Sequence, residues 1–124
     1  MQNLLLWLYL INAVFLITHE IDAARWREWE LFHLPGGAAG FLLLHFPLLF
    51  LVLYGLIQVE RWTFAGVVFS LVLGAAGISA FTIHTIFLRR VDQSFREPTS
   101  LVILWGALLV SLMQVGAAVL SLRR

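Results

Sequence analysis

The chain has 124 residues, and we expect them to form a single domain, residues 1–124. A hydrophobic share of 61%, a charged share of 12% and a mean hydropathy of +0.94 indicate a membrane protein, because soluble domains are roughly half apolar and a quarter charged. A net charge of +1 without a long basic run argues against a nucleic-acid partner, and the lack of cysteine and lysine excludes thiolate and Schiff-base chemistry.

Residues 4–21 form the first predicted membrane span. Up to His19 the run is interrupted only by Asn12 and Thr18, and no Lys or Arg precedes it, so it is typical of a retained helix and not of a secretory signal. Three further apolar runs are long enough to cross a bilayer, and they cover residues 38–59, 62–88 and 99–122. We therefore predict an all-α integral membrane four-helix bundle with both termini on the same side.

A polar stripe follows the first span. Four residues recur every seven positions, which places them on one face if the helix continues beyond the membrane as an interfacial extension through residue 34; they are Asn12, His19, Trp26 and His33. Asp22 and Trp29 fall beside that face. Glu20, Arg27 and Glu28 are expected to point elsewhere.

The third predicted span carries small residues at near-helical spacing. They are Gly66, Ser70, Gly74 and Gly77. Such a face lets a neighbouring backbone approach closely. If it points outward, we expect it to form a homodimer interface.

The distribution of arginines predicts the orientation. The first and third loops lie on one side of the membrane and carry Arg25, Arg27, Arg89, Arg90 and Arg96, against three arginines on the side of the termini. The positive-inside rule then places these two loops in the cytoplasm.

Histidines from three spans fall near that same side. His19 lies at the end of the first span, His45 lies about 10 Å inside the second and His84 about 6 Å inside the third, at the rise of an α-helix. Ionisable groups within spans usually face the interior of the bundle. We therefore expect the three rings to lie at a common depth, where they can meet.

The first functional hypothesis is a divalent-metal site. Its ligands would be His19, Asp22, His45 and His84, because imidazole and carboxylate groups suit Zn, Fe or Mn and helical bundles build such sites from facing helices. No sequential metal-binding motif is present, so this hypothesis rests on position. Haem held between two opposed histidines is a further alternative.

The second hypothesis is an acid–base enzyme that acts on an apolar, lipid-like small molecule. Glu20, Asp22 or Glu30 would move the proton, because burial can keep a carboxylic acid protonated near neutral pH. The substrate pocket would contain Trp26, Trp29 and Asn12.

A hypothesis of another class makes the protein a non-catalytic accessory subunit of the membrane. The polar residues would then form a structural network, because hydrogen bonds between helices help to hold membrane bundles together. Asn12 and Gln114 are expected to make such bonds near the middle of the bilayer.

Several short motifs resemble a family of small bacterial multi-pass membrane proteins of unknown function. They are His-Glu-Ile-Asp-Ala at 19–23, Trp-x-x-Trp-Glu at 26–30 and Leu-Pro-Gly-Gly at 34–37, and the resemblance covers about residues 10–50, with weaker likeness in the two later spans. It implies a bacterial inner-membrane location and a shared site. The residues that it singles out are His19, Glu20, Asp22, Trp29, Glu30 and His45.

Overall fold

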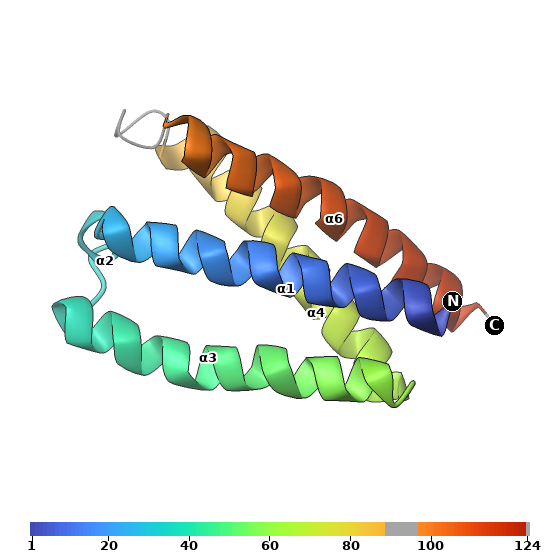
Figure 1. The fold of residues 1–124 in the computed structure, drawn as a ribbon. Helices are drawn as coiled ribbons and strands as arrows, with labels where there is room; N and C mark the ends of the chain where they lie inside the picture. Colours follow the sequence, from blue (N-terminus) through green and yellow to red (C-terminus); the bar gives the residue numbers. More distant parts are fainter. Residues whose placement is uncertain (89–96, 124) are drawn as a thin grey trace.

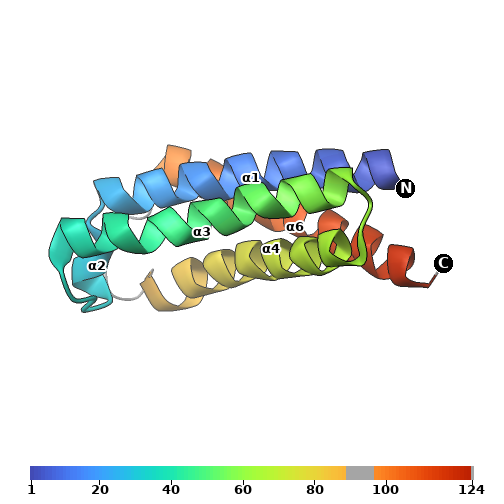
Figure 2. The ribbon, with the colours of Figure 1, turned by 90° about the horizontal axis from the view of Figure 1, so that it is seen from below.

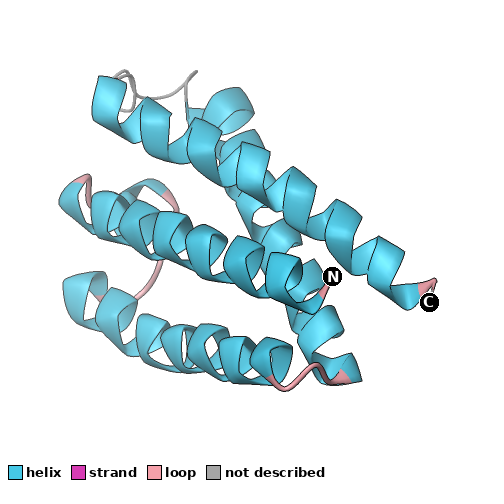
Figure 3. Cartoon of the chain, turned by 45° about the vertical axis from the view of Figure 1, so that its right-hand side comes forward, coloured by secondary structure: helices cyan, strands magenta, loops and turns pink. Residues whose placement is uncertain are grey.

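The computed structural model describes residues 1–88 and 97–123, and most of them are helical (Figure 3). In chain order the helices are α1 (Gln2–Arg25), α2 (Glu28–Leu31), α3 (Gly37–Glu60), α4 (Phe64–Thr82), its π-helical continuation η1 (Ile83–Leu88) and α6 (Pro98–Leu122). The described part of the chain contains no strand. Arg89, Arg90 and Arg96, on which the predicted orientation depends, lie outside the described residues.

Four helices are long and apolar enough to cross a membrane, namely Gln2–Arg25, Gly37–Glu60, Phe64–Ile86 and Pro98–Leu122. The predicted all-α membrane fold is therefore confirmed. Large apolar side chains on the outside of the bundle, such as Leu43 and Phe46, are 74% and 82% exposed, as expected for a surface that faces lipid. α1 begins and α6 ends at the same end of the bundle (Figure 1).

The predicted helical extension through residue 34 is wrong. α1 ends at Arg25, and Arg27 has a left-handed backbone with φ 54°, so the chain turns before the four-residue α2 begins at Glu28. A left-handed residue cannot continue a right-handed helix. The stripe is therefore broken after Trp26, His33 is exposed, and Glu28, which was expected to point elsewhere, is buried.

α3 and α4 pack tightly where they are joined and separate toward the other end. Thr63 caps α4, because its Oγ1 accepts a hydrogen bond from the Gly66 N–H at 3.0 Å. A Cβ on Gly66 would lie only 2.5 Å from the carbonyl oxygen of Gln58, so the two backbones are in direct contact there. From this turn the two helices diverge toward the end of the bundle that holds α2 (Figures 1 and 2).

The small residues of α4 pack inside the bundle. A Cβ on Gly74 would lie 2.5 Å from the Val115 side chain, and one on Gly77 would lie within 2 Å of the Ser111 hydroxyl, so α6 covers this face. The predicted homodimer face is thus occupied by the chain's own helices, and we correct that prediction.

Polar side chains in the same layer join three helices. The Asn12 Nδ2 of α1 donates to Gln114 Oε1 of α6 at 2.7 Å, and Gln114 Nε2 donates to the Ser70 carbonyl of α4 at 3.1 Å. Asn12 and Gln114 are fully buried. This agrees with the expected hydrogen bonds between helices, and it places Asn12 in the core and not beside a pocket.

Candidate functional site

A cavity of about 380 Å³ lies at the α2 end of the bundle, where α3 and α4 diverge. It is bordered by side chains from α1, α2, α3, α4 and η1, and the three histidines expected to meet, His19, His45 and His84, all line it. Two carboxylates, Glu20 and Glu28, line it as well. Most of the other lining residues are apolar, so these five polar groups determine its chemistry.

His19, Glu28 and His84 form the tightest cluster in this cavity. Each offers one possible metal-ligand atom, and the three atoms lie within 4.8 Å of one another. All three side chains are buried, with exposed fractions of 5%, 7% and 6%. The rings of His19 and His84 meet edge to face, with 4.6 Å between their centroids.

The His84 ring is held from both sides. Its Nδ1 donates to the carbonyl oxygen of Ala80 at 2.9 Å, since a carbonyl can only accept, and its Nε2 lies 2.5 Å from Glu28 Oε1. A histidine ligand in a metalloprotein likewise donates a hydrogen bond from one ring nitrogen to the protein, which orients the other; here the other nitrogen faces Glu28, the neighbouring possible ligand. His84 belongs to the π-helix η1, and π-helical turns occur frequently at functional sites.

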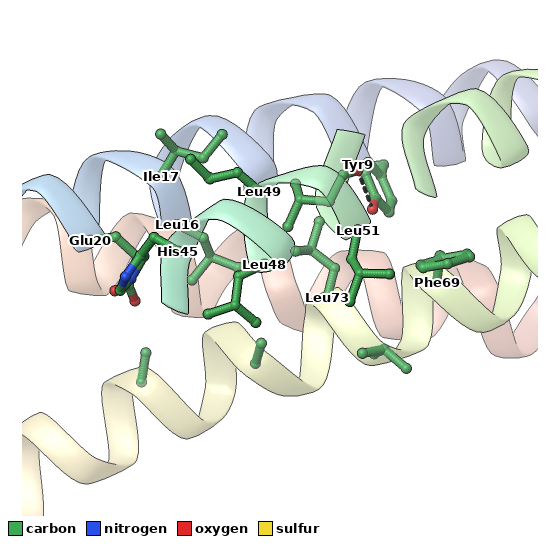
Figure 4. Close-up of a pocket in the computed structure, with 14 residues that line it drawn as sticks. Tyr9, Leu16, Ile17, Glu20, His45, Leu48, Leu49, Leu51, Phe69 and Leu73 are labelled. Carbon is green, nitrogen blue, oxygen red and sulfur yellow. Dashed lines mark hydrogen bonds and ion pairs between the residues drawn. The ribbon is translucent and has the colours of Figure 1, made fainter. Parts of the chain in front are cut away.

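Glu20 and His45 form a second pair with the same construction. The Nδ1 of His45 donates to the carbonyl oxygen of Phe41 at 2.7 Å, and its Nε2 lies 2.5 Å from Glu20 Oε2. The His45 side chain is 12% exposed and that of Glu20 is 40% exposed. Figure 4 shows the two side chains next to each other, reaching between α1 and α3.

In each pair a proton must lie between the imidazole nitrogen and the carboxylate oxygen, because two lone pairs would repel at this separation. The pair is then either an imidazolium beside a carboxylate or a neutral imidazole beside a carboxylic acid. Its net charge is zero in both cases. Such a pair can both donate and accept a proton, which is the requirement for general acid–base chemistry.

Several predicted site residues lie outside this cavity. Asp22, predicted as a metal ligand and as a catalytic acid, instead accepts a hydrogen bond from Ser100 of α6 at 2.5 Å and pairs with Arg25 at 3.1 Å. Glu30 is exposed and forms an ion pair with Arg27.

The predicted pocket residues also separate. Trp29 lines the cavity and packs against Phe41, with ring centroids 5.2 Å apart. Trp26 lies under the guanidinium of Arg25, 4.6 Å from its ring centroid, and is absent from the cavity lining. Asn12 is in the polar network of the core described above.

Comparison with known proteins identifies the group to which the chain belongs. Residues 5–121 match a family of unknown function (DUF6713). The chain belongs to this family. No curated protein and no solved structure is detectably similar to it. The resemblance to an uncharacterised family is therefore confirmed, and it extends over nearly the whole chain.

Glu28 is a residue of the candidate site that was not predicted from the sequence. The seven-residue spacing suggested an unbroken helix, on which Glu28 would face away from His19. Nothing between Arg25 and Glu28 signals a helix end, because the left-handed position is occupied by Arg27 and not by the usual Gly or Asn. Only the composition could have indicated Glu28: a histidine within a span, such as His84, needs a polar partner, and the chain has only seven acidic residues.

Proposed function

We propose that this protein is a small integral membrane enzyme that uses a divalent metal at His19, Glu28 and His84 to act on an apolar substrate from the bilayer. The observation that supports the proposal most is the burial of two imidazoles and one carboxylate within 4.8 Å of one another on the wall of a cavity. Lone ionisable groups in a membrane bundle are costly, so such a grouping favours a functional site.

The composition of the cluster favours a catalytic centre over a structural one. Structural zinc sites use four protein ligands, whereas catalytic zinc sites use three, often two histidines and a glutamate, and leave a position for water or substrate. Two histidines and one carboxylate are also the ligand set of non-haem Fe²⁺ enzymes. Zn²⁺ and Fe²⁺ are therefore the first metals to test, followed by Mn²⁺. The metal would act as a Lewis acid toward a substrate bound in the cavity.

Glu20 and His45 supply the second component of the proposed mechanism. The pair borders the same cavity, and the backbone carbonyl of Phe41 holds its imidazole in place. In this role the pair would donate a proton to a bound substrate or accept one from it. Haem held between His19 and His84 is not part of the proposal, because their contacting rings leave no space for a porphyrin between them.

The test is a metal-binding measurement on purified protein with a closely matched pair of variants. Glu28→Gln removes the charged ligand and keeps the shape of the side chain. Glu30→Gln makes the same substitution two residues away, at an exposed position outside the cavity. The protein is stripped with a chelator, titrated with Zn²⁺ or Fe²⁺ under reducing conditions, and analysed for bound metal after desalting.

We expect one metal ion per chain for the native protein and for Glu30→Gln. For Glu28→Gln we expect affinity to fall by at least about tenfold, since the loss of an outer-shell partner alone commonly has that effect. If the native protein binds no metal at stoichiometric level, or if both variants bind equally, the metal proposal is wrong. The non-catalytic accessory role would then be the better interpretation of the buried polar groups.

A further inference from the structure

An apolar groove begins beside the candidate site and continues into the membrane-spanning part of the bundle. It has a volume of about 260 Å³ and lies between α1, α3 and α4 (Figure 4). Glu20 and His45 lie at one end of it, and Tyr9 lies at the other. Every other lining residue has a hydrocarbon side chain, including Leu48, Val52 and Leu73.

The groove and the cavity at the metal cluster adjoin each other. Glu20, His45, Leu48, Ala76 and Ala80 line both. A molecule lying in the groove would therefore have one end at the Glu20–His45 pair, next to His19, Glu28 and His84. The small side chains of Ala76 and Ala80 keep the passage between the two spaces open.

The length of the groove suits one extended chain. Along α1 it runs from Tyr9 to Glu20, a distance of about 16 Å at the rise of an α-helix. Its walls belong to three helices that are long and apolar enough to span the membrane. A ligand would therefore enter from the bilayer, and only an apolar chain would be stable along these walls.

The two ends of the groove differ in polarity. The hydroxyl of Tyr9 donates to the carbonyl oxygen of Val52 at 2.8 Å, so its hydrogen is already used. At the opposite end, the Glu20–His45 pair has a net charge of zero and can only accept a hydrogen bond, because one of its hydrogens bonds the Phe41 carbonyl and the other lies between His45 Nε2 and Glu20 Oε2. A charged head group would lack a counter-charge in that pair, whereas a hydroxyl group can donate its hydrogen to Glu20.

We propose that this groove binds a single-chain amphiphile with a neutral hydroxyl head, its hydrocarbon chain along α3 and α4 and its hydroxyl at Glu20 and His45. This inference rests on the proposed function, because it names the class of substrate on which the proposed enzyme would act. The hydroxyl-bearing carbon would then lie beside the metal cluster.

The test uses a long-chain alcohol that carries a photoactivatable diazirine near the end of its chain. Native protein in phosphatidylcholine nanodiscs is irradiated with this probe, and the labelled residues are identified by mass spectrometry. Ala76→Phe places a ring at the junction of the groove and the cavity. Ala75→Phe is the matched control, because the neighbouring alanine is also exposed but lines neither space.

We expect labelling at groove residues near Tyr9 and Phe69, a decrease of at least fivefold in Ala76→Phe, and native labelling in Ala75→Phe. Excess unlabelled alcohol should compete for the groove in the native protein, which keeps the test decisive if Ala76→Phe does not fold. A fatty acid probe of the same length should label the groove less than the alcohol does. Equal labelling by acid and alcohol would overturn the assignment of the head group.

Labelling spread evenly over lipid-facing positions such as Phe46, without competition, would show that ordinary bilayer lipid covers the groove, and would overturn the proposal. The metal content of the same samples separates the two proposals. A groove that is not labelled in a metal-loaded protein refutes the substrate class alone. Specific labelling of a protein that binds no metal refutes the metal centre and leaves the binding site.

Discussion

The contact between α3 and α4 at Gly66 gives a prediction whose size can be worked from the geometry. In Gly66→Ala the new Cβ would lie 2.5 Å from the Gln58 carbonyl oxygen and 2.7 Å from the Val59 nitrogen, whereas ordinary contacts begin at 3.4 Å. The backbones must therefore separate by about 1 Å. The Gln58 carbonyl cannot easily move, because it accepts a hydrogen bond from the Thr63 N–H at 3.2 Å in the turn.

Overpacking of this kind costs about 1–3 kcal/mol, while alanine in place of glycine in a helix contributes about 1 kcal/mol in the opposite direction. We therefore expect Gly66→Ala to lower the free energy of unfolding by up to about 2 kcal/mol. Gly116→Ala is the control, since beyond its own helical turn no atom lies within 4 Å of its added Cβ, and it should raise stability by up to about 1 kcal/mol.

The assay is the midpoint of unfolding in mixed detergent micelles as the denaturing detergent is increased, followed by circular dichroism. Gly66→Ala should unfold at a lower denaturant fraction than the native protein, and Gly116→Ala at the same or a higher one. If Gly66→Ala is as stable as Gly116→Ala, then α3 and α4 do not meet at this point. The close contact at this turn would then not explain why α3 and α4 diverge toward the cavity.

Three further predictions follow from the polar groups. Asn12→Ala removes the hydrogen bond to Gln114, and since bonds between membrane helices are worth roughly 0.6–2 kcal/mol, the unfolding midpoint should fall while metal binding stays native. Zn²⁺ at a hundred times the native dissociation constant should stabilise the native protein by about 2.7 kcal/mol, and Glu28→Gln, which binds at least about tenfold more weakly, by no more than about 1.4 kcal/mol; equal stabilisation of both would mean that zinc binds elsewhere. Arg25→Ala breaks ion pairs with Asp22 and Glu97. Because the arginine side chain is 48% exposed, we expect a loss below about 1 kcal/mol that shrinks in high salt, and a larger, salt-independent loss would contradict this.

Hydropathy was sufficient to predict the membrane helices, because a spanning helix must be apolar over a length fixed by the bilayer. The convergence of His19, His45 and His84 could be predicted for a related reason. Each lies a known number of residues from the same end of its span, and a helix converts residue count into depth. The structure brings all three to one cavity, although their chemical roles stay predictions.

Glu28 could not be assigned in this way. Its placement depends on the turn at Trp26 and Arg27, which changes the direction of every residue after it. A periodic pattern extrapolates a helix through such a turn unless glycine, asparagine or proline marks it. As a result the prediction selected Asp22 as the metal-binding carboxylate, whereas Glu28 lies beside His19 and His84.

The three carboxylates Glu20, Asp22 and Glu28 each join the α1–α2 segment to a different helix. Their partners are His45 of α3, Ser100 of α6 and His84 of η1. Carboxylates need such partners wherever water is scarce, so hydrogen bonding by itself does not distinguish a structural role from a catalytic one.

The surroundings of each carboxylate and its partner distinguish the two roles. Asp22 is held by a hydroxyl and a guanidinium on the side of α6, and it does not border the cavity. Glu28 has a second imidazole within ligand distance and faces the cavity, which adjoins an apolar groove through Ala76 and Ala80. Asp22 therefore joins α1 to α6 at this end, and Glu28 is the carboxylate that we propose for metal binding beside the cavity.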